Sequence, residues 1–142
     1  MARVRIVVVD DFAGWRRTIV SLLLEDPRLE VVYEASDGLD GVEKCQQLQP
    51  DLVLLDVSLP DICGLEAARR IREVCPDSKI VFLTATPCRD VMREALKIGA
   101  VGYVGKANVL RDLMPAVRAA VGEEEYLRFT VLPNNQGNIP EE

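Results

Sequence analysis

Short apolar runs alternate with amphipathic segments five times along this chain, and this alternation limits the possible fold more than any other feature. A short apolar run bounded by turn residues is typical of a strand buried on both faces, whereas apolar residues at helical spacing predict a helix with one buried face. The runs predict strands over residues 6–9, 29–35, 52–56, 79–84 and 101–105, and the amphipathic segments predict helices over 12–24, 38–48, 65–74, 88–98 and 108–121. We therefore predict an α/β domain with a doubly wound, five-stranded parallel sheet and helices on both faces.

Helical spacing also predicts which side chains face the core. Residues three or four positions apart lie on the same face of a helix. The residues expected to face inward are Phe12, Trp15, Ile19, Leu22 and Leu23; Leu39, Val42, Cys45 and Leu48; Leu65, Ala68, Ile71 and Cys75; and Leu110, Leu113, Met114, Val117 and Val121.

The alternating pattern stops at residue 122, and a polar, acidic segment follows. Residues 122–142 contain five acids and one base, and the rest of the chain contains 18 acids and 16 bases, so most of the net charge of −6 lies in this segment. We expect residues 1–122 to form one domain and residues 123–142 to be a flexible tail or the start of a linker. Within that segment, residues 126–132 could form a short strand or an arm.

Composition excludes several classes of protein. The acidic balance argues against a domain whose main role is to bind nucleic acid. No apolar run approaches the roughly 18–20 residues of a membrane span, and the first run is too short for a signal peptide, so we expect a cytoplasmic protein. The chain has no histidine, which excludes Ser-His-Asp and Cys-His catalysis, and its four cysteines form no Cys-x-x-Cys pair, so we expect no zinc site.

Acidic, hydroxyl and amino side chains stand at the ends of four of the five predicted strands. Asp10 and Asp11 follow the first strand, Asp56 ends the third, Thr84 ends the fourth, and Lys106 follows the fifth. The carboxyl ends of parallel strands meet at one edge of the sheet, where open α/β sheets bind their ligands. Clustered carboxylates repel one another unless a cation is present, and Mg²⁺ prefers such oxygen ligands. The set predicts a site where a carboxylate accepts a phosphoryl group.

Each residue of this set also has an ordinary structural explanation. An aspartate such as Asp10 or Asp11 commonly caps the helix that follows it. Thr84 alone would suit a strand, and Lys106 alone would suit a solvated loop. The occurrence of all of them at one predicted sheet edge favours the functional interpretation.

Four separated stretches of the sequence resemble the response-regulator receiver domains of two-component signalling. They are VVVDD (7–11), LLDVSLPDICGLE (54–66), VFLTA (81–85) and KIGAVGYVGK (97–106). The resemblance runs from about residue 3 to residue 121, and the sequences of these stretches are most similar to receivers of the NarL/FixJ-like class. It implies a flavodoxin-like sheet with the strand order 2-1-3-4-5.

The resemblance also implies a role for each residue at the phosphorylation site. Asp56 would accept the phosphoryl group. Asp11 would hold Mg²⁺ directly and Asp10 would assist, often through water. The carbonyl oxygen of Ser58 would be a further ligand, and Asp56 itself would complete the metal site.

A conformational switch and its partners are implied by the same resemblance. Thr84 would hydrogen-bond the phosphoryl group, and Lys106 would pair with it. Tyr103 would be an aromatic switch whose ring moves inward as Thr84 shifts, although a tyrosine packed on the last two helices explains it as well. A sensor histidine kinase would be the donor, and residues 88–121 would signal, with dimerisation as one possible output. The chain would be either a single-domain receiver or a fragment of a regulator that carries a DNA-binding domain, with no direct nucleic-acid binding of its own.

Three other functions are compatible with this type of fold. A Mg²⁺-dependent phosphohydrolase would need a second acid beside Asp56 and a cap, but the nearest following acid is Asp61, in a loop. A flavin-binding module would need a phosphate-binding loop after the first strand, where this chain has two aspartates. A degenerate receiver, used only as an interaction surface, would not need the complete set of acids, Thr84 and Lys106. We therefore predict a signalling switch and not an enzyme.

Overall fold

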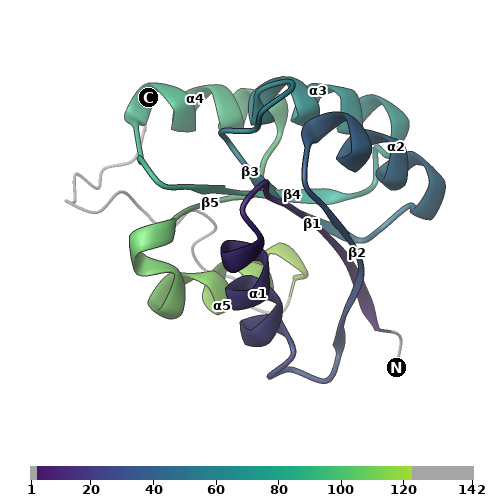
Figure 1. The fold of residues 1–142 in the computed structure, drawn as a ribbon, viewed down its shortest axis with the longest axis vertical. Helices are drawn as coiled ribbons and strands as arrows, with labels where there is room; N and C mark the ends of the chain where they lie inside the picture. The colour runs from purple at the N-terminus through teal and green to yellow at the C-terminus, as the bar shows by residue number, and fades with distance from the viewer. Residues whose placement is uncertain (1–2, 123–142) are drawn as a thin grey trace.

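A five-stranded parallel sheet forms the centre of the molecule, with the strand order β2-β1-β3-β4-β5 (Figure 1). The structure is a computed structural model, and it describes residues 3–122. Strands and helices alternate as β1 (Val4–Val9), α1 (Ala13–Leu23), β2 (Leu29–Ala35), α2 (Gly38–Leu48), β3 (Leu52–Asp56), α3 (Gly64–Val74), β4 (Lys79–Thr84), α4 (Arg89–Ile98), β5 (Gly102–Gly105), a short 3₁₀ turn (Lys106–Asn108) and α5 (Val109–Ala120). The predicted fold class and strand order are confirmed.

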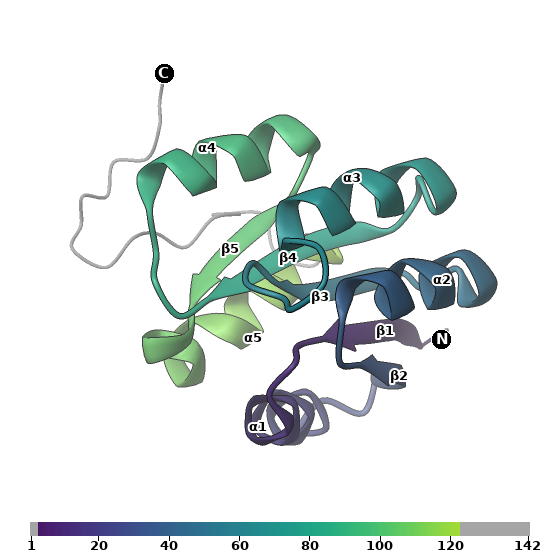
Figure 2. The ribbon, with the colours of Figure 1, turned by 45° about the horizontal axis from the view of Figure 1, so that its top comes forward.

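Helices cover both faces of the sheet and enclose two separate cores. Helices α2, α3 and α4 cover one face, and α1 and α5 cover the other (Figures 1 and 2). Successive side chains of a strand point to opposite faces. In β1, Val7 and Val9 therefore pack in the core beneath α2–α4, and Ile6 and Val8 pack in the core beneath α1 and α5. We call these two sides the α2–α4 face and the α1/α5 face.

Three apolar residues that were expected to face inward are exposed instead. Phe12, Leu39 and Leu110 have exposed fractions of 61%, 49% and 77%. Each lies at or within the first turn of a helix that follows a strand: Phe12 is the N-cap of α1, and the other two are the second residues of α2 and α5. In α2 and α5 the buried face includes the neighbouring first residue, Gly38 or Val109, and the following residue, Leu39 or Leu110, lies outside that face.

The acidic segment after residue 122 lies outside the described residues. The short strand or arm expected at 126–132 falls in it, and the domain boundary at residue 122 stays a prediction. Within residues 3–122, none of the helices combines the length and the apolar character that crossing a membrane requires.

Candidate phosphoacceptor site

Two buried carboxylates lie side by side at the carboxyl edge of the sheet. Val9 of β1 pairs with Leu55 of β3, so the next residue of each strand, Asp10 and Asp56, is brought to the same level of the edge. Both side chains are buried. Asp11 follows in the loop and is exposed, and one carboxylate oxygen from each of the three aspartates lies within 4.8 Å of the others. The structure thus brings together the three acids that the sequence predicted.

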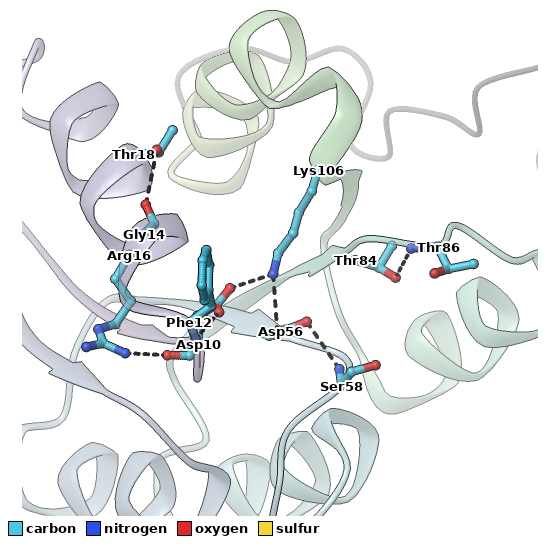
Figure 3. A network of polar contacts seen from close by, with 10 residues as sticks. All are labelled: Asp10, Phe12, Gly14, Arg16, Thr18, Asp56, Ser58, Thr84, Thr86 and Lys106. Atoms are coloured by element: carbon cyan, nitrogen blue, oxygen red, sulfur yellow. Dashed lines mark hydrogen bonds and ion pairs between the residues drawn. The ribbon is translucent and has the colours of Figure 1, made fainter.

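Lys106 reaches into this acidic pair from the end of β5 (Figure 3). Its Nζ atom lies 2.7 Å from Oδ2 of Asp10 and 3.3 Å from Oδ2 of Asp56. The side chain is 6% exposed, although lysine is rarely buried without a partner. The ring of Trp15, in α1, covers the ammonium group with its centroid 5.1 Å from Nζ. The buried lysine is therefore held by two charges and one aromatic face.

The environment of Asp56 opposes its ionisation. Burial raises the pKa of Asp56 above its ordinary value, the charge of Lys106 lowers it, and the negative charge of Asp10 raises it further. The backbone N–H of Ser58 donates to Oδ1 of Asp56 at 3.1 Å, which favours the charged form. The balance of these effects is a raised pKa, as is common for reactive groups in functional sites.

The donor atoms at this edge suit a hard divalent cation. Although Oδ2 of Asp10 forms an ion pair with Lys106, it accepts no hydrogen bond from the residues that the structure describes. A buried carboxylate oxygen in that state has capacity for a further cationic partner. Three converging carboxylates fit a cation such as Mg²⁺, which binds through a few carboxylates and water.

Two contacts fix the loop between β3 and α3 that carries Ser58. Gly64 packs so tightly that a Cβ atom at this position would overlap the carbonyl oxygen of Asp56. The carboxylate of Asp61 accepts hydrogen bonds from the backbone N–H groups of Gly38 and Leu39, both at 2.8 Å. Asp61 therefore caps α2 from a loop 23 residues away in the sequence, and the loop beside Asp56 is tied to that helix.

Thr84 and Tyr103 form a second polar group beside the acids. Thr84, the last residue of β4, accepts a hydrogen bond from the N–H of Thr86 at 3.1 Å, and its hydroxyl acts on Tyr103 by lowering the pKa of the tyrosine. The hydroxyl of Tyr103 accepts from the N–H of Cys88 at 3.1 Å and donates to its carbonyl oxygen at 3.3 Å. Burial raises the pKa of Tyr103. Within residues 3–122, no hydrogen bond joins Thr84 to Asp56 or Lys106.

Tyr103 is buried beneath α4. It belongs to the core of the α2–α4 face, whereas α5 covers the other face. Of the last two helices, on which the simpler explanation packs this tyrosine, only α4 lies on the same face as Tyr103. Because Cys88 is the N-cap of α4 and makes no side-chain cap, the tyrosine hydroxyl supplies the capping contact.

Sequence reasoning missed three residues that act around this site: Arg16, Asp61 and the Trp15 ring over Lys106. Arg16 donates to the backbone carbonyl oxygen of Asp10 at 2.7 Å. Each of these contacts joins segments that lie far apart in the sequence or bonds a backbone atom, so no residue pattern indicates it. The available signal was the position of Trp15 and Arg16, four and five residues after Asp11.

Comparisons with known proteins identify the family. The sequence matches the family described as "Response regulator receiver domain" over residues 6–118. It is 35% identical over 124 residues to "Response regulator GacA" from Pseudomonas viridiflava, a match that covers 87% of this chain and 58% of that protein. It is 38% identical over 128 residues to "Protein-glutamate methylesterase/protein-glutamine glutaminase 1" from Geobacter sulfurreducens, with 89% of this chain and 34% of that protein covered. The chain thus spans little more than half, or less, of these curated relatives.

Solved structures of response regulators have the same fold as this chain. A LuxR-family two-component response regulator from Aurantimonas has a TM-score of 0.80 at 31% identity, with 87% of this chain and 89% of that chain covered. The signal receiver domain of the putative response regulator NarL from Mycobacterium tuberculosis has a TM-score of 0.79 at 29% identity, with 86% and 99% covered. The match over residues 6–118, the sheet order and the acidic edge lead to one conclusion: the chain belongs to the response regulator receiver domain family of two-component signalling.

Proposed function

We propose that this chain is a phosphorylation switch in which Asp56 accepts a phosphoryl group from the phosphohistidine of a sensor histidine kinase. The observation that carries the proposal is the burial of Asp56 beside Asp10 at the carboxyl edge of the sheet, with the ammonium group of Lys106 in contact with both carboxylates. In the transfer, a carboxylate oxygen of Asp56 bonds to phosphorus while the phosphorus–nitrogen bond of the donor breaks, and the imidazole nitrogen keeps the bonding electron pair. Lys106 would pair with the negative charge that arrives on Asp56, and its distance of 3.3 Å from that carboxylate supports this role.

A divalent cation fits the same proposal. Asp10, Asp11, Asp56 and the carbonyl oxygen of Ser58 would hold Mg²⁺, which when bound neutralises charge on the transferring phosphoryl group. The position of Lys106 supports a cation site at these residues. Its ammonium group lies closest to Asp10, which shows that the clustered acids attract a positive charge there. The hydrogen bond from the Ser58 N–H to Asp56 keeps the backbone of Ser58 beside the carboxylate.

The output would be a change in surface and not turnover of a substrate. Thr84 would leave its present partners to bond the new phosphoryl oxygens, which would alter its contact with Tyr103 and, through the Tyr103 hydroxyl, the start of α4. The surface formed by α4, β5 and α5 would then favour a second copy or another protein. Apart from slow hydrolysis of its own aspartyl phosphate, we propose no enzymatic activity, and we propose a cytoplasmic location without direct contact with membrane or nucleic acid.

The test is intact-mass measurement after incubation with acetyl phosphate, with and without Mg²⁺. We expect the wild type to gain the mass of one phosphoryl group in the presence of Mg²⁺, and Asp56→Asn to gain none. Asp77→Asn is the matched control, because Asp77 is exposed and lies in the loop before β4, at the opposite edge of the sheet. Stoichiometric labelling of Asp56→Asn at another site would refute the role of Asp56.

A further inference from the structure

Arg16 connects the first helix to the ends of two strands. Its Nη1 atom donates to the backbone carbonyl oxygen of Asp10 at 2.7 Å (Figure 3). Its Nε atom forms an ion pair with Oε1 of Glu34 in β2, at 3.3 Å. The arginine side chain is 20% exposed, so most of it is shielded from water. A guanidinium can serve both partners at once, because its donors form a rigid, planar fork.

The arginine completes the set of contacts that hold Asp10. The N–H of Asp10 donates to the carbonyl oxygen of Ala35 at 3.0 Å, and Oδ1 of Asp10 accepts from the N–H of Phe12 at 2.9 Å. With the carbonyl oxygen bound to Arg16, every polar atom of Asp10 except Oδ2 is engaged in a hydrogen bond. The remaining atom, Oδ2, is the one directed at Lys106.

The same contact orients the next residue. The carbonyl oxygen of Asp10 belongs to a planar peptide unit that also contains the nitrogen and Cα of Asp11. When Arg16 fixes this oxygen, it fixes the plane from which the Asp11 side chain departs. One guanidinium therefore restrains the peptide unit that joins two of the three clustered carboxylates.

We infer that Arg16 is a positioning residue for the divalent-cation site, which it holds in shape through the Asp10–Asp11 peptide unit. This inference rests on the proposed function, since it assigns the cation to these carboxylates. Without the guanidinium, the carbonyl oxygen of Asp10 loses a charge-assisted hydrogen bond, and the loop must rearrange to satisfy it. Glu34 has a lesser part, because its own side chain is 44% exposed and solvent therefore screens part of the ion pair.

The experiment measures Mg²⁺ affinity by isothermal titration calorimetry and, in parallel, the Mg²⁺ concentration that gives half-maximal phosphorylation by acetyl phosphate. The variants are Arg16→Met, which removes the donors, Arg16→Lys, which keeps the charge, and Glu34→Gln. Arg17→Met is the matched control, because Arg17 is the exposed neighbour on the same helix. Thermal unfolding of each variant shows that the compared samples are folded.

We expect Arg16→Met to bind Mg²⁺ roughly tenfold more weakly than the wild type, as is typical when an outer partner of a metal ligand is removed. Arg16→Lys should be intermediate, and Glu34→Gln and Arg17→Met should be close to wild type. At saturating Mg²⁺ the phosphorylation rate of Arg16→Met should return to the wild-type rate, a recovery that general loss of stability would not produce. If Arg16→Met fails to fold, the Mg²⁺ affinity of Arg16→Lys is the test: weaker binding than the wild type supports the inference, and wild-type binding overturns it.

Two outcomes separate this inference from the proposed function. Wild-type Mg²⁺ affinity in folded Arg16→Met and Arg16→Lys, with normal phosphorylation of the wild type, would overturn the role of Arg16 alone. A wild-type chain that neither binds Mg²⁺ nor becomes phosphorylated would overturn both.

Discussion

The ammonium nitrogen of Lys106 lies closer to Asp10, at 2.7 Å, than to Asp56, at 3.3 Å. One buried cation thus serves two buried carboxylates and is not dedicated to Asp56. The pair would otherwise place two like charges in a site sheltered from water, where their repulsion is costly. The lysine therefore offsets this repulsion, in addition to the role in phosphorylation that we propose for it.

The stability that is lost when the Lys106 ammonium group is removed should be restored in part by another cation. We expect Lys106→Met to lower the free energy of unfolding by roughly 1–3 kcal/mol at neutral pH, because two buried carboxylates lose a charged partner. Added Mg²⁺ should recover more stability in this variant than in the wild type. Urea unfolding with and without Mg²⁺ measures both effects, and Lys97→Met, at an exposed lysine, is the control. Equal stability of Lys106→Met and the wild type without Mg²⁺ would contradict the prediction.

Trp15 should influence phosphorylation through Lys106. A cation–π contact of this kind is worth about 1 kcal/mol, so Trp15→Leu should slow phosphorylation by acetyl phosphate roughly fivefold at saturating Mg²⁺. Trp15→Phe, which keeps an aromatic face, should lie between this variant and the wild type. The rates follow from intact-mass measurements over time. A leucine variant as fast as the wild type would show that the ring merely packs beside the lysine.

The contact between Asp61 and α2 predicts a specific dependence of stability on pH. Burial raises the pKa of Asp61, but the hydrogen bonds from the N–H groups of Leu39 and Gly38 outweigh it and lower the pKa to about 2. Because this pKa is below the value of about 3.9 in unfolded chains, the carboxylate stabilises the fold above about pH 4 and loses this effect as the pH falls toward 2.

We therefore expect Asp61→Asn to be less stable than the wild type at neutral pH, and the difference in free energy of unfolding to shrink between about pH 4 and about pH 2. Urea unfolding across this range measures the difference. Asp77→Asn is again the control. A difference between Asp61→Asn and the wild type that is constant over the whole range would contradict the assigned role.

Tyr103→Phe should loosen the start of α4. The hydroxyl of Tyr103 satisfies both backbone groups of Cys88, which has no side-chain cap of its own. Its removal should cost about 1 kcal/mol and speed amide hydrogen exchange in the first turn of α4 while leaving α1 unchanged. Tyr33→Phe, which also removes a hydrogen-bonded hydroxyl but lies in β2, is the control. Unaltered exchange at residues 88–92 of Tyr103→Phe would refute the capping role.

The sequence was sufficient to predict the acidic edge because its members follow directly after apolar runs. Asp10, Asp56 and Lys106 each end or follow a strand, and parallel pairing then brings strand ends together without further information. The strand order itself came from a resemblance, since the alternation of strands and helices is compatible with other orders.

Contacts that depend on loop paths and side-chain directions could not be predicted in this way. Arg16 bonds a backbone oxygen, and Asp61 bonds the backbone of a helix 23 residues earlier in the chain, so neither contact has a periodic signature. The side-chain direction of Tyr103, on an edge strand, was equally open. Leu110 shows the opposite error, because the buried face of α5 begins at Val109 and leaves Leu110 outside it.

The alternation of side chains along β3 and β4 has a consequence for how a signal would travel. Leu55 and Leu83 lie in different cores, so the residues that follow them, Asp56 and Thr84, face opposite sides: Asp56 toward α1 and α5, and Thr84 toward the α4 side with Tyr103. In the proposed switch, phosphate would arrive on one side of a single backbone layer and be sensed on the other. The conformational change would then cross the sheet at the ends of β3 and β4, from one face to the other, and would not travel around its edge.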